Sequence, residues 1–367
     1  MTVKKAVFRP SFGNRPDQLL GRDAIMDQVT EGLQSFPGSA ERSLLLIGQR
    51  GMGKTALLLE IADRAKELDY VAVRVTCGES MLDNLVELLQ REGSRYIKES
   101  GRSVKGVSAG ALGFSFGLTF TEEAQRSFGF RVKLEMICEK LSKVGKRVLI
   151  LADEVTPSVA GMRELAAAYQ ELAGTETDIA IVMAGLPAAV SDLLNHKTLT
   201  FLNRAQRIVL EMIPIHEVEL YYQSAFSRAS IKASPEIIKE AAKSTEGFPY
   251  QIQLVGHYLS KVSAGGKNVS RKMLLQALDA VTGDIDSKVF HAMINPLSDL
   301  DISFLTAMAE HDGSIKTADI GELLHLGHGT VQTYRKRLLD AGVISAPRRG
   351  ELVFVFPQLA DYLRRRG

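Results

Sequence analysis

Short apolar runs alternate with longer amphipathic segments between residues 43 and 212. The runs are apolar at nearly every position and rich in β-branched residues, which is typical of parallel strands covered by helices on both faces. They predict strands at 43–48, 70–77, 147–154, 178–185 and 206–213. The amphipathic segments predict helices at 53–67, 80–98, 127–144 and 159–173. This order indicates an α/β domain with a parallel sheet and helices on both of its faces.

The pattern changes twice after Pro214. Residues 215–285 have helical spacing throughout, and a third composition begins near residue 291. The last part predicts helices at 298–312 and 316–326, a third helix after a Gly-rich turn, two strands joined by an Arg-Arg-Gly turn, and a closing helix. We therefore predict an α/β core over residues 1–213, a helical lid over 214–290 and a winged helix-turn-helix over 291–367.

Side chains can also be assigned within the C-terminal helices. Thr317 and Thr330 are expected to be N-caps, because a threonine hydroxyl there can accept a backbone hydrogen bond of the first turn. Ile320, Leu323 and Leu324 are expected to face inward, and Gly342 suits the position just after a helix end.

One Gly-rich stretch interrupts the α/β pattern at residues 104–121. In its second half Phe114, Phe116, Leu118 and Phe120 alternate with small or polar residues, which predicts an inserted β-hairpin. The apolar face either packs on the domain or forms a docking or oligomer surface.

Composition narrows the classes of protein that fit. Apolar residues make up 45% of the chain and charged residues 24%, as in ordinary globular proteins. The formal net charge is only +2, so a nucleic-acid interface would have to rest on local clusters of charge. Cys77 and Cys138 form no zinc or disulfide pattern. With no apolar leader or membrane-length run, a cytoplasmic protein without a membrane partner is expected.

The stretch "GQRGMGKT" carries the clearest chemical signal. It fits the phosphate-loop (Walker A) pattern G-x-x-x-x-G-K-[ST] and lies between an apolar strand and an amphipathic helix, the context that this motif requires. Glycines let backbone N–H groups turn toward an anion, and the helix N-terminus adds partial positive charge. Lys54 is expected to bridge the β- and γ-phosphates and Thr55 to bind Mg²⁺. The residues expected at the nucleotide are Gly48, Gly51, Met52, Gly53, Lys54, Thr55 and Ala56.

A second signal is "RVLILADE", a strand that ends in two acids. Ligands bind at the carboxyl ends of strands in open α/β sheets. Asp153 is therefore expected to help hold Mg²⁺, and Glu154 to polarise the attacking water as a general base. The pattern N-K-x-D that selects guanine is absent from the sequence, which favours ATP.

These motifs, with two others, resemble the AAA+ superfamily. "LLGRDAIMDQVTEGL" resembles the Gly-Arg box of the origin-recognition and archaeal-ATPase branches, and "GFPYQIQLVGHYL" resembles the lid motif shared with STAND ATPases. The resemblance implies that Gly21 and Arg22 lie beside adenine, and that Gly247 and Pro249 lie where the lid closes over the nucleotide.

The resemblance also implies an arginine finger that reaches a neighbouring subunit, so a homo-oligomer or a protein partner is expected. Arg204 resembles that residue, while a solvated side chain or a local ion pair is the alternative and Arg207 is a competitor. Two family features are missing: Gly185 and Leu186 stand where a polar sensor is common, and Tyr250 stands near the usual place of a sensor arginine. Weaker stabilisation of transition-state charge predicts slow hydrolysis, raised by a partner.

Charge in the last domain is segregated along the chain. Residues 298–330 hold six acids and one basic residue, whereas residues 331–367 hold eight basic residues and three acids. If the third helix of this domain is exposed, its residues Gln332, Thr333 and Arg335 could reach the bases or phosphates of DNA. Arg348 and Arg349, in the turn between the two strands, would then contact the DNA backbone.

Two functions follow from these patterns. The leading hypothesis is an ATP-dependent switch whose ATP or ADP state positions the winged helix on double-stranded DNA. The alternative is a STAND-like signalling ATPase or scaffold, whose winged helix docks a protein or locks the nucleotide in place.

Overall fold

A computed structural model describes residues 7–10, 16–97, 114–264, 266 and 268–366. The chain divides into two compact units, each described here by itself. The α/β unit comprises Gly21–Gly48 and Gly53–Glu211, and the helical unit comprises Met1–Leu20, Gln49–Met52 and Met212–Gly367. Among the described residues, no helix is long and apolar enough to span a membrane.

The α/β unit contains the predicted parallel sheet. Its five strands are β1 (Ser43–Ile47), β2 (Tyr70–Thr76), β5 (Arg147–Asp153), β6 (Ile179–Gly185) and β7 (Gln206–Val209). They lie in the order β2-β5-β6-β1-β7, and all four pairings are parallel. The two central neighbours β5 and β6 are buried at nearly every position, which explains their unbroken apolar sequences.

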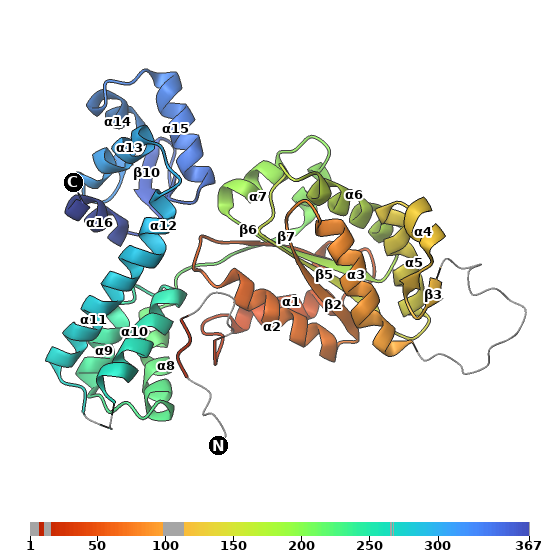
Figure 1. Ribbon diagram of the computed structural model, residues 1–367, viewed down its shortest axis with the longest axis horizontal. Helices are drawn as coiled ribbons and strands as arrows, with labels where there is room; N and C mark the ends of the chain where they lie inside the picture. The colour runs from red at the N-terminus through yellow and green to blue at the C-terminus, as the bar shows by residue number, and fades with distance from the viewer. Residues whose placement is uncertain (1–6, 11–15, 98–113, 265, 267, 367) are drawn as a thin grey trace, which may run out of the picture. The chain divides into compact units, whose positions relative to one another are not determined.

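Helices cover both faces of this sheet (Figure 1). The buried side chains of α3, α5, α6 and α7 form one apolar cluster with alternate residues of the strands, while α1 and α2 pack against each other on the opposite face. Their bounds are α1 (Asp23–Gln34), α2 (Lys54–Glu67), α3 (Met81–Gly93), α5 (Phe130–Ser142), α6 (Ala160–Gly174) and α7 (Pro187–Leu194). The fold expected from the sequence is therefore confirmed.

The inserted segment is described only in its second half, because residues 104–113 lie outside the described residues. There β3 (Phe114–Phe116) pairs with β4 (Thr119–Phe120) in an antiparallel hairpin, followed by the short helix α4 (Glu122–Ser127). Phe114, Leu118 and Phe120 are at most 6% exposed and belong to the apolar cluster of the domain. This face packs inward, as the first of the two interpretations expects.

The helical unit begins with four helices, α8 (Ile215–Arg228), α9 (Pro235–Lys243), α10 (Pro249–Val262) and α11 (Arg271–Ile285). A π-helical turn (Asp286–Phe290) continues α11 into α12 (His291–Ile294). The N-terminal segment also belongs here: the Phe8 ring packs edge-on against Tyr221, Tyr222 and Phe226. Gly256 leaves no room for a Cβ atom beside that ring.

The C-terminal part of this unit has the predicted order of elements and one further strand. Helices α13 (Asp299–Ala309), α14 (Thr317–Leu323), α15 (His328–Asp340) and α16 (Gln358–Arg366) surround a small antiparallel sheet. The sheet order is β8-β10-β9, with β8 (Ile315–Lys316), β9 (Ile344–Ser345) and β10 (Glu351–Phe354).

Three side-chain predictions in this part are wrong. Thr317 is the first helical residue and not the N-cap, because its hydroxyl donates to the Gly350 carbonyl at 3.0 Å instead. Thr330 lies inside a helix that begins two residues earlier, with Gly327 as N-cap. Leu323 is 46% exposed, although Ile320 is fully buried as expected.

Candidate nucleotide site

The phosphate loop connects β1 to α2 in the way the motif demands. Gly51 and Gly53 have φ angles of 76° and 83°, a left-handed conformation that only glycine adopts freely. Helix α2 begins at Lys54, directly after Gly53. The loop therefore has the backbone conformation of an anion-binding turn at a helix N-terminus.

Hydrogen bonds fix both ends of the loop. The Gly48 N–H donates to the Gly185 carbonyl at 3.2 Å, which ties the loop to the end of β6. The Lys54 Nζ donates to the Gly48 carbonyl at 2.7 Å. The Met52 side chain is buried, and its N–H bonds to the Gln49 carbonyl, whereas Ala56 is half-buried in the first turn of α2.

Asp153 joins the two motifs. The Thr55 Oγ1 donates to Asp153 Oδ2 at 2.8 Å, and the Glu154 backbone N–H donates to Asp153 Oδ1 at 3.1 Å. The Asp153 side chain is only 5% exposed, so its orientation is set by these bonds. Parallel pairing of β5 between β2 and β6 brings this carboxylate to the edge of the sheet where α2 begins.

Glu154 lies immediately beyond the strand with a different environment. Its φ of 57° is left-handed, which is uncommon for a residue with a side chain, and the residue is exposed. Such strained positions concentrate at functional sites. The next residue returns to the sheet, since the Val155 N–H bonds to the Ala184 carbonyl at 2.9 Å. The structure thus separates a buried acid from an exposed acid at adjacent positions.

Sequence reasoning missed Arg74. It lies on edge strand β2, and its Nη1 is 3.2 Å from Asp153 Oδ2. A single charged residue within the apolar run "YVAVRVTC" was the available signal. Cys77 lies nearby: burial raises the pKa of its thiol, a backbone hydrogen bond of Thr156 lowers it in part, and the Glu154 carboxylate raises it further.

Close packing explains why β6 ends without a polar sensor. A Cβ added at Gly185 would lie 2.9 Å from Val155 Cγ2 and 3.0 Å from Val190 Cγ2. A side chain there would force these valines to move. Close packing at Gly185 therefore excludes a polar sensor side chain at the end of β6.

The other expected site residues have these positions. Gly21 has a φ of 64°, and the Arg22 guanidinium is buried and donates to the Glu211 carbonyl at 2.7 Å. Arg204 is exposed on the 3₁₀ turn Thr200–Arg204, whereas Arg207 bonds to Asn203 at 2.9 Å.

Gly247 and Pro249 belong to the helical unit. Gly247 has a φ of 75°, and a Cβ there would collide with the Ile213 backbone. Their approach to the nucleotide stays a prediction, as does the contact of Gly21 and Arg22 with adenine.

The expected DNA-contacting residues differ in exposure. Thr333 is exposed on α15, but Gln332 and Arg335 are half-buried on its flanks. The exposed cations of this helix are ion-paired: Lys336 with Asp340 at 3.1 Å and Arg337 with the buried Asp301 at 2.8 Å. Arg348 and Arg349 are exposed between β9 and β10, and neither has an ion pair within the described part of the chain.

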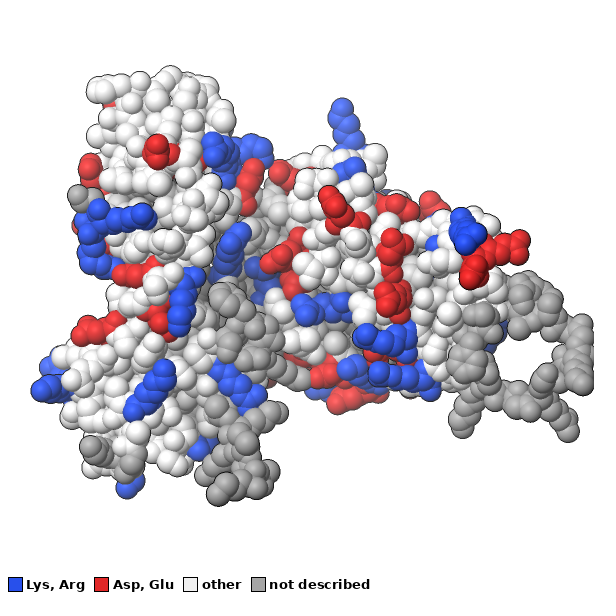
Figure 2. All heavy atoms as spheres, viewed as in Figure 1, with Lys and Arg blue, Asp and Glu red and all other residues white. Residues whose placement is uncertain are grey.

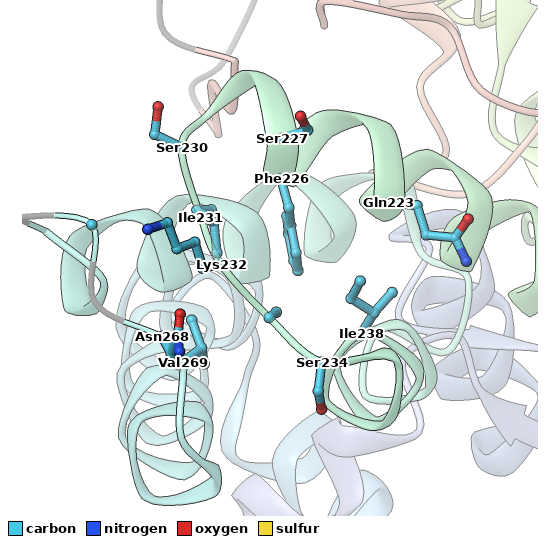
Figure 3. A pocket seen from close by; sticks show the side chains of 12 residues that line it. Gln223, Phe226, Ser227, Ser230, Ile231, Lys232, Ser234, Ile238, Asn268 and Val269 are labelled. Atoms are coloured by element: carbon cyan, nitrogen blue, oxygen red, sulfur yellow. The ribbon is translucent and has the colours of Figure 1, made fainter.

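The helical unit also contains a cavity of about 780 Å³ among α8, α9 and the segment before α11 (Figure 3). Phe226 and Ile238 point toward it, and among the described residues that line it only Lys232 is charged. It shares no residue with the phosphate loop or with the acidic end of β5, so we do not assign it to the nucleotide.

Comparisons with known proteins agree with this geometry. Among solved structures, a Walker-type ATPase of Pyrococcus abyssi is 14% identical, with a TM-score of 0.69 over 95% of this chain and 97% of that one. The ORC2 protein of Aeropyrum pernix in its ADPNP-ADP complexes is 14% identical, with a TM-score of 0.61 over 97% and 96%. At these identities the likeness shows a shared fold.

Family matches divide the chain in two. Residues 287–363 match a family described as a domain of unknown function. Residues 18–210, more than half of the chain, match the family described as the AAA ATPase domain. They include the phosphate loop, the acidic strand and the Gly-Arg box. The chain is a member of the AAA ATPase domain family.

Proposed function

We propose that this protein binds ATP with Mg²⁺, hydrolyses it slowly, and uses the ATP or ADP state to position a C-terminal winged helix on double-stranded DNA. One observation carries the nucleotide part. The Thr55 hydroxyl, at the end of the phosphate loop, donates to the Asp153 carboxylate, at the end of the acidic strand, across 98 positions of the sequence. This hydrogen bond joins the loop that we propose for phosphate to the carboxylate that we propose for the metal.

The residues fit Mg²⁺ by their chemistry. Thr55 and Asp153 would hold it through oxygen atoms, which this ion prefers, and phosphate and water oxygens would supply the remaining ligands. Within the described ranges no group of three or more His, Cys, Asp or Glu residues could hold a metal ion. When bound, Mg²⁺ neutralises charge on the phosphates.

Groups of the protein itself would bind the phosphates and activate the attacking water. Backbone N–H groups of Gly51 and Gly53 would bind phosphate oxygens, and the Lys54 ammonium would exchange its bond to the Gly48 carbonyl for the β- and γ-phosphates. Glu154 would orient water and accept its proton, because its carboxylate is exposed where the strand ends.

Slow hydrolysis is expected because two groups that would stabilise transition-state charge, a polar sensor and a sensor arginine, are missing from their usual places. Gly185 has no room for a polar side chain, and Tyr250 stands near the usual place of a sensor arginine. Arg204 is exposed and has no ion pair with any described residue, which suits a finger that acts on a neighbouring copy. We infer that assembly or a partner raises the rate.

The C-terminal part supports the output half of the proposal. Its element order, with α15 preceding the β9–β10 turn, supports the proposal of a winged helix. An aromatic contact links it to the lid motif, because the Phe248 ring, just before Pro249, lies 4.7 Å from the Phe356 ring, just after β10. A change in the turn at Gly247 would therefore reach the C-terminal sheet through packed rings.

A mobility-shift assay with random duplex DNA tests this output, with ATP, ADP and no nucleotide compared. Arg348→Glu with Arg349→Glu should weaken binding at low salt and reduce its salt dependence. Arg271→Glu, an exposed change on α11, is the matched control. An unchanged duplex affinity in the variant with both wing substitutions would contradict a wing that contacts DNA.

One observation favours the alternative, a signalling ATPase or scaffold whose winged helix docks a protein. Lys336 and Arg337, the exposed cations of α15, are already held by Asp340 and Asp301. In Figure 2 basic and acidic side chains are interspersed over the visible face. Absence of duplex binding, together with oligomers that form on addition of a protein partner, would favour this alternative.

A further inference from the structure

Arg74 has a position that the proposed function does not use. Strand β2 is an edge strand, and Thr76 of β2 pairs with Asp153 of β5. Because side chains two residues apart share a face, Arg74 lies on the same face as the Asp153 carboxylate. Its guanidinium Nη1 is 3.2 Å from Asp153 Oδ2, and the Arg74 side chain is 37% exposed.

Asp153 Oδ2 has two donors at once. The Thr55 hydroxyl is 2.8 Å away and the Arg74 Nη1 is 3.2 Å away, while Oδ1 accepts the backbone N–H of Glu154. The carboxylate is almost completely buried, so its negative charge needs a counter-charge in the folded chain. Arg74 supplies that charge to the carboxylate that the proposed function assigns to Mg²⁺.

We infer that Arg74 is a positioning residue that competes with Mg²⁺ for Asp153 and so sets the Mg²⁺ concentration at which the nucleotide site fills. This inference rests on the proposed metal role of Asp153 and Thr55. A fixed positive charge near the carboxylate lowers the affinity of a divalent cation. Because its side chain is 37% exposed, water can replace Asp153 as the partner of the Arg74 guanidinium when Mg²⁺ binds.

The size of the effect follows from Coulomb's law. In water the repulsion between two unit charges about 4 Å apart is weak. Between the Arg74 guanidinium and the doubly charged Mg²⁺, at a slightly longer distance, it changes the binding constant of Mg²⁺ roughly tenfold. The edge position keeps the guanidinium near solvent, so the water-like value applies, and added salt reduces it.

The test is a Mg²⁺ titration of the full chain with a fluorescent ADP analogue, repeated without metal in EDTA. Arg74→Gln should lower the Mg²⁺ concentration at half-saturation about tenfold. Arg74→Lys, which keeps the charge, should stay close to the wild type. Arg64→Gln, an exposed change on α2 outside the site, is the matched control. Thermal melting checks that each variant is folded.

Two results would overturn the inference. One is an unchanged or raised Mg²⁺ midpoint in Arg74→Gln. The other is a loss of more than about tenfold in ADP affinity in EDTA, which would make Arg74 a phosphate ligand and not a competitor of the metal. If the ADP affinity of the wild type does not change with Mg²⁺ concentration, the proposed metal site is wrong. Failure of the metal site can therefore be distinguished from failure of the inference about Arg74.

Discussion

Phe356 joins the C-terminal sheet to the lid motif, and its truncation to alanine should weaken the helical unit substantially. The Phe356 side chain is 5% exposed. Its ring lies 4.7 Å from that of Phe248 at an interplanar angle of 31°, and 5.9 Å from that of Phe290 at 70°. The substitution removes both contacts and leaves a cavity in the apolar interior.

The magnitude follows from these contacts. Replacing a buried Phe with Ala costs about 3–5 kcal/mol of the free energy of unfolding, of which each aromatic pair contributes about 0.5–1.5 kcal/mol. Phe36→Ala is the matched control, because Phe36 is 73% exposed and its loss should change stability by less than about 0.5 kcal/mol. The chain contains no tryptophan, so urea unfolding is best followed by circular dichroism.

A double-mutant cycle separates the contact from the cavity. Phe248→Leu and Phe356→Leu keep apolar volume, and their coupling energy should be about 0.5–1.5 kcal/mol. A loss below about 1 kcal/mol for Phe356→Ala, or additive leucine variants, would refute the view that these rings couple the lid motif to the C-terminal sheet.

Three further predictions concern the α/β unit. Glu154→Gln should keep ATP affinity and lower steady-state phosphate release at least about 100-fold, since the amide cannot accept the proton of water; rapid release would give that role to another residue. Gly185→Asn should lower the urea-unfolding free energy by about 1–3 kcal/mol through overpacking against Val155, and an unchanged value would contradict that packing. Cys77 should alkylate slowly near pH 7 and faster as pH approaches its raised pKa, while Cys138 should react only on unfolding; mass spectrometry of alkylated peptides checks both.

Much of the α/β unit could be predicted from its sequence, because its signals are local. Buried parallel strands are apolar at nearly every position, and the phosphate-loop residues are adjacent in the chain. Helices α4 and α7, with 6 and 8 residues, are too short for a clear periodicity. The prediction of Thr317 as an N-cap failed because its hydroxyl bonds to Gly350, a partner that only the tertiary fold provides.

The contacts of Arg74 could not be predicted for the same physical reason. Arg74 and Asp153 are 79 positions apart in the sequence, and their bond depends on the register of β2 and β5. The link between Phe248 and Phe356 likewise depends on how the C-terminal segment packs within the helical unit. Local sequence can therefore identify the chemical groups of the site, whereas their counter-charges and couplings require the fold.

Calorimetric titration of ATP with Mg²⁺ into the wild type and Lys54→Ala tests the central claim most directly. Lys54 starts α2 at the end of the phosphate loop, and Arg64, exposed in the last turn of the same helix, provides the control Arg64→Gln. The account predicts saturable binding to the wild type and the control, and at least about a 100-fold loss in Lys54→Ala, because a charge-assisted contact to phosphate disappears. Equal affinity in Lys54→Ala, or no binding to the wild type, would contradict a nucleotide site at this loop.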